Sequence, residues 1–203
     1  MPNPISKVMP SASIVMGNVG NSPFSRHPDL ALLVAESISS WSNVENFLLK
    51  LFVQILGGNK SLATDIYISL ESQAAKTSAI NAAARSILKM ESDELKIFKA
   101  IMAISKANVK NRNKLAHWTW GYSPDLNEAL LLVDPKATIS EYDRSKIYVY
   151  KKIDFESIVE SNNNLCHYIQ LLKFVFMNHS ANNNNELITE LLSKPEIIAK
   201  IPK

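Results

Sequence analysis

A scarcity of cysteine and of long apolar runs sets the first limits on this chain of 203 residues. The single cysteine, Cys166, excludes an intramolecular disulfide and a cluster of thiolate metal ligands. No apolar run approaches the roughly 20 residues of a membrane-spanning helix, and the first residues lack the apolar segment of a secretory signal. We therefore expect a soluble, cytoplasmic protein without membrane contact, in which Cys166 packs into the core.

The sequence also lacks the motifs of the common hydrolases and phosphate-binding enzymes. It has no glycine-rich phosphate loop, no Gly-x-Ser-x-Gly and no His-Glu-x-x-His pattern. Its 4 histidines are too dispersed to indicate a metal site. The sequence therefore predicts no metal and no other cofactor.

Neither sign of charge dominates the chain. The 22 Lys and Arg residues against 19 Asp and Glu residues give a formal net charge of +3 at pH 7. This balance does not suggest a broad basic face that coats nucleic acid, but it permits contact with a few phosphates at one place. With 46% hydrophobic residues, the chain is long enough for one substantial core, and we expect one compact domain.

Proline and glycine punctuate the first part of the sequence. Residues 1–27 contain several prolines and no sustained period, which predicts a flexible N-terminal arm. Pro28 and Asp29 then begin a long helix that ends at Gly57-Gly58. Its apolar seam repeats every three or four residues and comprises Ile38, Trp41, Val44, Leu48, Leu51 and Ile55.

Further helices follow in the middle of the chain. Two shorter ones are predicted at about 60–73 and 77–90, the second rich in alanine. A longer one begins behind the capping residues Ser92-Asp93-Glu94. Its stripe starts apolar and turns polar at the far end, in the order Ile97, Ile101, Ile104, Asn108, Asn111, Leu115 and Trp118.

Two short runs rich in β-branched, leucine and tyrosine residues interrupt the helical pattern. These runs, Ala129–Val133 and Lys146–Lys152, predict a small β-hairpin at about 128–153. Helical periodicity returns over about 154–178 and again over about 186–193.

The predicted elements indicate an all-α domain over residues 28–194 that carries the hairpin as an insertion. The arm of residues 1–27 precedes this domain, and a tail of residues 195–203 follows it. No internal repeat is visible, so a single domain is favoured over an array of repeats.

The polar end of the long central helix carries residues of chemical interest, in the stretch "NRNKLAHW" (residues 111–118). At about 100° per residue, Asn113 and His117 share a face, while Arg112 lies roughly 140° from His117. The two groups therefore do not point the same way on one helix. A long arginine side chain can cover part of this gap, or a second copy of the helix can supply the missing group.

These side chains match the cleavage of RNA by its own 2′-hydroxyl. That reaction needs a group to take the hydroxyl proton, a group to protonate the leaving 5′-oxygen and a cation for the charge on the phosphate. His117 suits either proton transfer and Arg112 suits the third role, while Asn113 can position the imidazole or a phosphate oxygen. The structural alternative is a helix-terminal histidine stabilised by the helix dipole beside a solvated arginine.

An acid on the first long helix provides a possible partner for the arginine. Glu45 falls within or at the edge of the apolar stripe, where a carboxylate is costly unless a cation meets it. We hypothesise that Glu45 orients Arg112 if the two long helices pack side by side. The alternative is a glutamate at the rim of the helix in contact with water.

Aromatic residues follow the histidine directly. Trp118, Trp120 and Tyr122 are candidates for stacking bases, and Lys114 is a further candidate for binding the substrate. Such an aromatic cluster can equally close the core at the end of a helix.

At these residues the chain resembles a known family. "RNKLAHW" resembles the signature of HEPN domains (higher eukaryotes and prokaryotes nucleotide-binding), commonly Arg-Asn-x-x-Ala-His, and "WSNVENFL" around Glu45 is also similar to HEPN proteins. The resemblance covers about residues 28 to 180. It implies a mainly antiparallel helical bundle and, in many members, a metal-independent endoribonuclease that acts as a toxin or in antiviral defence.

The resemblance also implies roles and partners. Arg112 and His117 would be catalytic, Asn113 supportive, and the products would carry a 2′,3′-cyclic phosphate and a 5′-hydroxyl. The motifs of two protomers would face one another in a homodimer, with RNA as substrate and a cognate antitoxin or regulator as a possible partner. The competing hypotheses are a non-catalytic module that binds a nucleotide or a protein, and a purely structural helical subunit.

Overall fold

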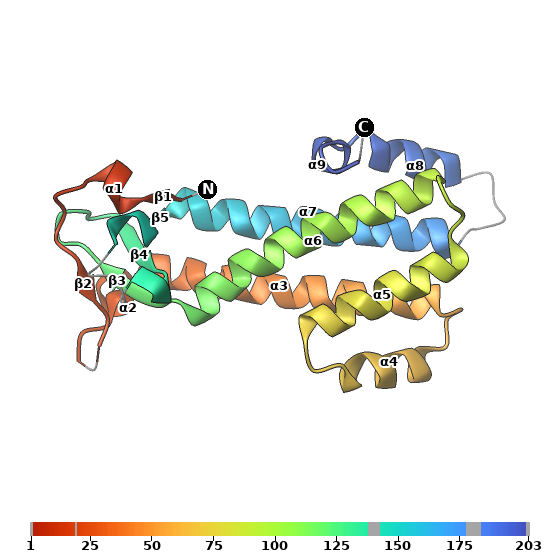
Figure 1. Cartoon of the computed structure of the whole chain (residues 1–203), viewed down its shortest axis with the longest axis horizontal. Helices are drawn as coiled ribbons and strands as arrows, with labels where there is room; N and C mark the ends of the chain where they lie inside the picture. The colour runs from red at the N-terminus through yellow and green to blue at the C-terminus, as the bar shows by residue number, and fades with distance from the viewer. Residues whose placement is uncertain (1, 19, 138–142, 178–183, 202–203) are drawn as a thin grey trace. The chain divides into compact units, whose positions relative to one another are not determined.

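The computed structural model describes residues 2–18, 20–137, 143–177 and 184–201 (Figure 1). The described chain is mainly helical and contains a small antiparallel sheet, so the prediction at this level is confirmed. Its longest helices are α3 (Pro28–Ile55), α6 (Asp93–His117) and α7 (Lys152–Met177). No helix of these described ranges combines the length and the apolar character that crossing a membrane requires.

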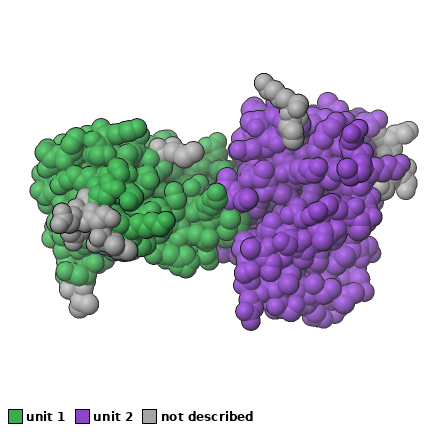
Figure 2. Space-filling view, viewed as in Figure 1, with its two compact units in different colours: residues 1–41, 108–161 green, residues 42–107, 162–203 purple. Residues whose placement is uncertain are grey.

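The chain divides into two compact units (Figure 2). Unit 1 comprises Met1–Trp41 and Asn108–Ser161, and unit 2 comprises Ser42–Ala107 and Asn162–Lys203. Each of the three long helices contributes residues to both units, so the single domain expected from the sequence stays a prediction.

Unit 1 contains the sheet, in which neighbouring strands are antiparallel and follow the order β1-β5-β4-β3-β2. The strands are β1 (Asn3–Pro4), β2 (Val15–Met16), β3 (Thr119–Tyr122), β4 (Ala129–Val133) and β5 (Ile147–Lys151). Strands β4 and β5 form the predicted hairpin, with Leu131 opposite Val149. This hairpin is the centre of a larger sheet, because β3 pairs with β4 and short N-terminal strands pair at both edges.

The central strand β4 is buried along its whole length because both faces of the sheet are covered. On one face, Leu131 and Val133 pack in a cluster with Ile5 of the N-terminal segment. On the other face, Leu130 packs with Phe155 and with further residues of α3, α6 and β5. A strand covered on both sides reads as a continuous apolar run, which is why "ALLLV" stands out in the sequence.

The N-terminal residues differ from the predicted flexible arm. Strands β1 and β2 and the short helices α1 (Ile5–Val8) and α2 (Pro23–Arg26) pack into unit 1, and Ile5 is fully buried. Arg144 Nη1 donates hydrogen bonds to the carbonyls of Pro10 and Ala12, at 2.8 and 2.9 Å. The segment has no local period because the residues that stabilise it lie more than a hundred positions away.

The helices of unit 2 follow the sequence prediction closely. They include α4 (Lys60–Ser69), α5 (Gln73–Ile87) and α8 (Asn184–Leu192). The predicted tail differs, because it contains the short helix α9 (Pro195–Ile198) with a buried Ile197. Cys166 is a free, buried thiol as predicted, and burial raises its pKa.

The docking of the N-terminal segment predicts a measurable cost for losing one buried side chain. Ile5→Ala is expected to lower the free energy of unfolding by about 2–5 kcal/mol, because it removes a fully buried side chain and leaves a cavity. Denaturant unfolding measures this change. Leu32→Ala, at a side chain that is 61% exposed, is the matched control, and an equal loss in both variants contradicts the docking.

Candidate functional site

The stretch predicted to carry the chemistry forms the last turns of α6 in unit 1. The helix is continuous from Asp93 to His117, so the separation of roughly 140° between Arg112 and His117 applies to the folded chain. Leu115 is buried in the core of the unit, whereas Asn113 and His117 are both exposed. The predicted proton-transfer group therefore faces away from the core of its own unit.

Arg112 lies at the edge of the core, and its side chain extends toward the exposed face of α6 that carries Asn113. Its Nε is enclosed and has no hydrogen-bond partner in the described part of the chain. Its Nη1 donates a hydrogen bond to Asn113 Oδ1 at 3.1 Å. The arginine thus covers part of the angular gap, because Asn113 shares its face with His117 one turn later.

An enclosed arginine N–H without an acceptor is uncommon, because the unmade hydrogen bond costs about 1–3 kcal/mol. The salt bridges among the described residues do not include Arg112. Its guanidinium therefore retains donors for an anion such as a phosphate.

Glu45, the predicted partner of Arg112, belongs to α3 in unit 2 and is half-buried. Tyr67 Oη donates a hydrogen bond to the Glu45 carbonyl at 3.5 Å. Burial, and to a smaller degree the Glu45 carboxylate, raises the pKa of Tyr67 to about 12. Because Arg112 belongs to unit 1, the proposed pairing stays a prediction.

The aromatic residues after the histidine lie in and around the core of unit 1. Trp120 Nε1 donates a hydrogen bond to the Leu115 carbonyl at 3.1 Å, and its ring packs against Phe24 and Phe155. Tyr122 is buried, with the Arg26 guanidinium 4.6 Å from its ring centroid. These contacts favour the structural role for both residues, which the sequence left open.

Trp118 and Lys114 lie together beside an aromatic pair. The Trp118 and Tyr148 rings are 5.9 Å apart, and Lys114 Nζ lies 5.1 Å and 5.4 Å from their respective centroids. The salt bridges of the described residues leave Lys114 without a carboxylate partner. The Lys114 ammonium thus lies over two aromatic rings and is available to bind an anion.

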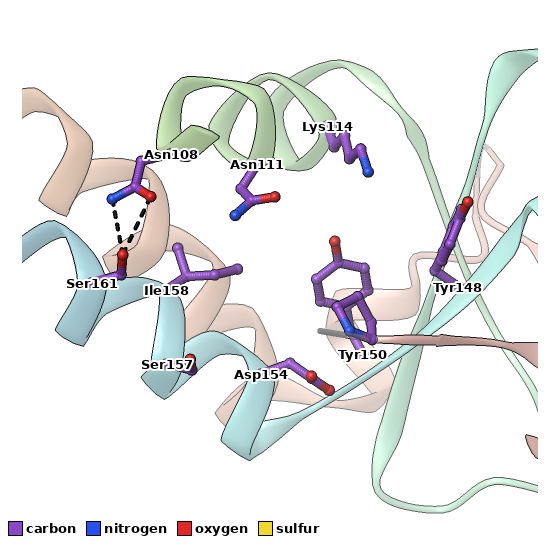
Figure 3. Close-up of a pocket in the computed structure, with 10 residues that line it drawn as sticks. Asn108, Asn111, Lys114, Tyr148, Tyr150, Asp154, Ser157, Ile158 and Ser161 are labelled. Carbon is purple, nitrogen blue, oxygen red and sulfur yellow. Dashed lines mark hydrogen bonds between the residues drawn. The ribbon is translucent and has the colours of Figure 1, made fainter. Parts of the chain in front are cut away.

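A cavity of about 180 Å³ opens beside Lys114 within unit 1 (Figure 3). Asn108, Asn111 and Lys114 of α6 line it, whereas His117 does not. His117 follows Lys114 by one turn, about 60° around the helix, and lies about 120° from Asn111. Asn108 and Ser161 exchange hydrogen bonds of 3.0 and 3.2 Å at one wall. The remaining lining residues are Pro2, Tyr148, Tyr150, Asp154, Ser157 and Ile158.

Tyr150 is the residue of this cavity that the sequence reading missed. Its side chain is 2% exposed, yet its hydroxyl points into the cavity toward Asn111 and Lys114 (Figure 3). The hydrogen bonds of the described residues include none to this hydroxyl. Burial, and then the nearby Asp154 and Tyr148, raises the pKa of Tyr150 to about 12, which keeps the phenol neutral.

A signal for this cavity is present in the sequence. Tyr148 and Tyr150 are two residues apart on one strand, and side chains at that spacing point to the same face. Asn108, Asn111 and Lys114 follow helical spacing on the polar end of α6. The two sets come together only because β5 lies beside α6 in the folded chain, which is a tertiary contact.

Comparison with protein-family models, with curated protein sequences and with solved structures finds no match for the chain.

The buried phenol predicts a pH dependence of stability. Tyrosine ionises with a pKa near 10.0 when unperturbed, but Tyr150 does so at about 12 in the folded chain. A raised folded pKa contributes stability that is present below pH 10 and is lost as the pH rises toward 12. Tyr150→Phe is therefore expected to lose less stability than wild type between pH 9 and pH 12, by on the order of 2 kcal/mol.

Denaturant unfolding at each pH measures the effect of Tyr150. The comparison with wild type isolates it, because the other late-titrating tyrosines, Tyr67 and Tyr168, are present in both proteins. Parallel stability profiles in the two proteins contradict a phenol that stays neutral in the fold.

Proposed function

We propose that the protein is a homodimeric HEPN-type endoribonuclease that cleaves RNA without a metal ion. The observation that carries the proposal is the state of Arg112 at the end of α6. Its Nη1 contacts Asn113 on the face of His117, its Nε is enclosed without an acceptor, and the described salt bridges do not include it. A cation without a carboxylate partner and an exposed histidine on the same helix end suit a phosphate ligand.

The reaction assigns one role to each residue. The RNA 2′-hydroxyl loses its proton and attacks the adjacent phosphorus, and the bond from phosphorus to the leaving 5′-oxygen breaks. His117 serves as the general base or as the general acid that protonates the leaving oxygen. Arg112 stabilises the charge on the phosphate, and Asn113 positions the arginine. The products are a 2′,3′-cyclic phosphate and a 5′-hydroxyl.

A second protomer supplies the group that one helix does not bring to the cleft. Arg112 and His117 of one helix are roughly 140° apart, so the arginine that serves each histidine comes from the other copy. Two copies of α6 facing each other across a twofold axis pair Arg112 of each copy with His117 of the other, in two equivalent clefts. This arrangement fits the dimer implied by the HEPN resemblance and a role as a toxin or antiviral effector under a regulator.

The second candidate function is a non-catalytic module that binds a nucleotide or a protein. The lining of the cavity favours it, because Asn111 and Lys114 line the cavity while His117 does not. In such a module, substitutions at the cavity change affinity, and the protein shows no turnover of RNA.

The endoribonuclease proposal predicts cleavage of single-stranded RNA in the presence of EDTA. His117→Ala is expected to lower the cleavage rate by about 10²–10⁴-fold, because a positioned proton-transfer group is lost. Gel analysis of labelled RNA, with end-group analysis for the cyclic phosphate, measures both rate and chemistry.

The matched control for His117 is His167→Ala, which removes an exposed histidine of unit 2. It is expected to cleave like wild type. Equal cleavage by wild type and His117→Ala, or cleavage abolished by EDTA, contradicts the proposed mechanism.

A shared cleft predicts that two inactive variants restore activity in combination. In a mixed dimer of Arg112→Ala and His117→Ala, one of the two clefts contains an intact Arg112 and an intact His117 from different protomers. Random pairing makes half of all dimers mixed, so co-expressed variants are expected to recover up to about a quarter of the wild-type activity. Cleavage rates of the separate and co-expressed proteins test this, and an absence of recovery contradicts a cleft built by two protomers.

A further inference from the structure

Two polar groups that line the cavity beside α6 have no hydrogen bond among the described residues. The hydroxyl of the buried Tyr150 points into it, and the described hydrogen bonds include none to the Asn111 side chain (Figure 3). Ser157 and Asp154 line the side formed by α7. The Tyr150 hydroxyl and the Asn111 amide therefore keep donors and acceptors for water or for a ligand.

The chemistry of the lining indicates a neutral polar ring with donors and acceptors on its edge. A neutral phenol can both donate and accept a hydrogen bond, and so can a primary amide. The hydroxyl of Ser157 has the same two capacities. One oxygen of Asp154, Oδ2, already accepts the N–H of Lys151 at 3.0 Å, so the other is available to a donor such as an exocyclic amine. Nucleobases present such mixed edges, and asparagine pairs with them through two hydrogen bonds.

The size of the cavity limits how much of a ligand it holds. Its volume of about 180 Å³ corresponds to roughly six water molecules at about 30 Å³ each and lies below the roughly 300 Å³ at which pockets for larger ligands begin. A single planar base is therefore accommodated, and the attached sugar and phosphate remain at the mouth. Lys114 also lines the cavity and has no carboxylate partner among the described salt bridges.

The charge of the adjoining helix favours a phosphate over a zwitterionic ligand such as an amino acid. From Asn108 to His117, α6 carries Lys110, Arg112 and Lys114 and no acidic residue. This local excess contrasts with the near balance of 22 cations and 19 anions in the whole chain. A nucleotide within an RNA strand brings the negative charge that this helix lacks.

We propose that this cavity binds one unpaired base of the RNA substrate, with Tyr150 and Asn111 on the base edge and Lys114 on the neighbouring phosphate. The inference rests on the proposed RNA substrate and adds a requirement on its conformation. The RNA must be single-stranded at this point, because a base enters the cavity only when it is unstacked and unpaired. His117 does not line the recognition site but follows Lys114 by one helical turn, so the bound base belongs to a nucleotide that neighbours the cleaved bond.

The test measures RNA affinity in the His117→Ala protein, which leaves the RNA intact. Fluorescence anisotropy gives the Kd for a labelled single-stranded RNA and for the same strand annealed to its complement. Tyr150→Phe removes only the hydroxyl and is expected to weaken single-strand binding about three- to tenfold, with duplex binding unchanged. Asn111→Ala, at a half-buried side chain, is expected to act in the same direction.

Two control variants match these substitutions. Tyr67→Phe removes another buried phenol, and Asn46→Ala removes an exposed amide, both in unit 2. Both are expected to bind either RNA like the parent protein. Circular dichroism of each variant establishes that the fold is retained.

Each outcome decides the inference. Weaker binding of the single strand alone supports the base site. Unchanged binding in both cavity variants shows that the cavity holds only water. An equal loss of affinity for single strand and duplex shows that the cavity does not recognise an unpaired base. Either result overturns the inference. Selective weakening together with no cleavage by wild type leaves the base site standing and rejects the nuclease.

Discussion

One hydrogen bond helps to fix the direction in which the functional stretch points. Trp120 Nε1 donates to the Leu115 carbonyl at 3.1 Å, and this carbonyl is among the last four of α6, which have no partner within the helix. The bond joins the end of the helix to β3, whose register with β4 is set by backbone pairing. The continuous helix and the buried Leu115, together with this junction, set the rotation of the last helical turns.

Once that rotation is set, helical geometry distributes neighbouring residues among three environments. Leu115 enters the core, His117 faces outward, and Asn111 and Lys114 line the cavity. Arg112 lies between the core and the exposed face, with one nitrogen enclosed and another bonded to Asn113. The proposed proton transfer and the proposed base recognition therefore use different side chains of one helix, with Lys114 and His117 one turn apart.

Local signals predicted the helices well and the sheet only in part. Pro28 and the glycines after Ile55 mark the ends of α3, and the buried run Ala129–Val133 marks a strand, because each pattern is set by its own neighbours. Strands β1 and β2 are two residues long and depend on partners far along the chain. Within the candidate site, sequence patterns indicated Lys114 but not Tyr150. The interest of the Tyr150 phenol lies in its burial and in its lack of a described hydrogen bond, and neither is visible in the sequence.

The pairing of β1 and β2 at opposite edges has a consequence for association between molecules. A sheet edge presents unpaired backbone groups onto which another chain can add a strand. Here one stretch of the chain, Asn3 to Met16, covers both the free side of β5 and the free side of β3. Gly121 permits the close approach at one edge, since a Cβ there would lie 2.8 Å from the Val15 carbonyl. The N-terminal segment thus protects the edges of β3 and β5 against edge-to-edge aggregation. Its detachment would expose the backbone groups of both edges at once.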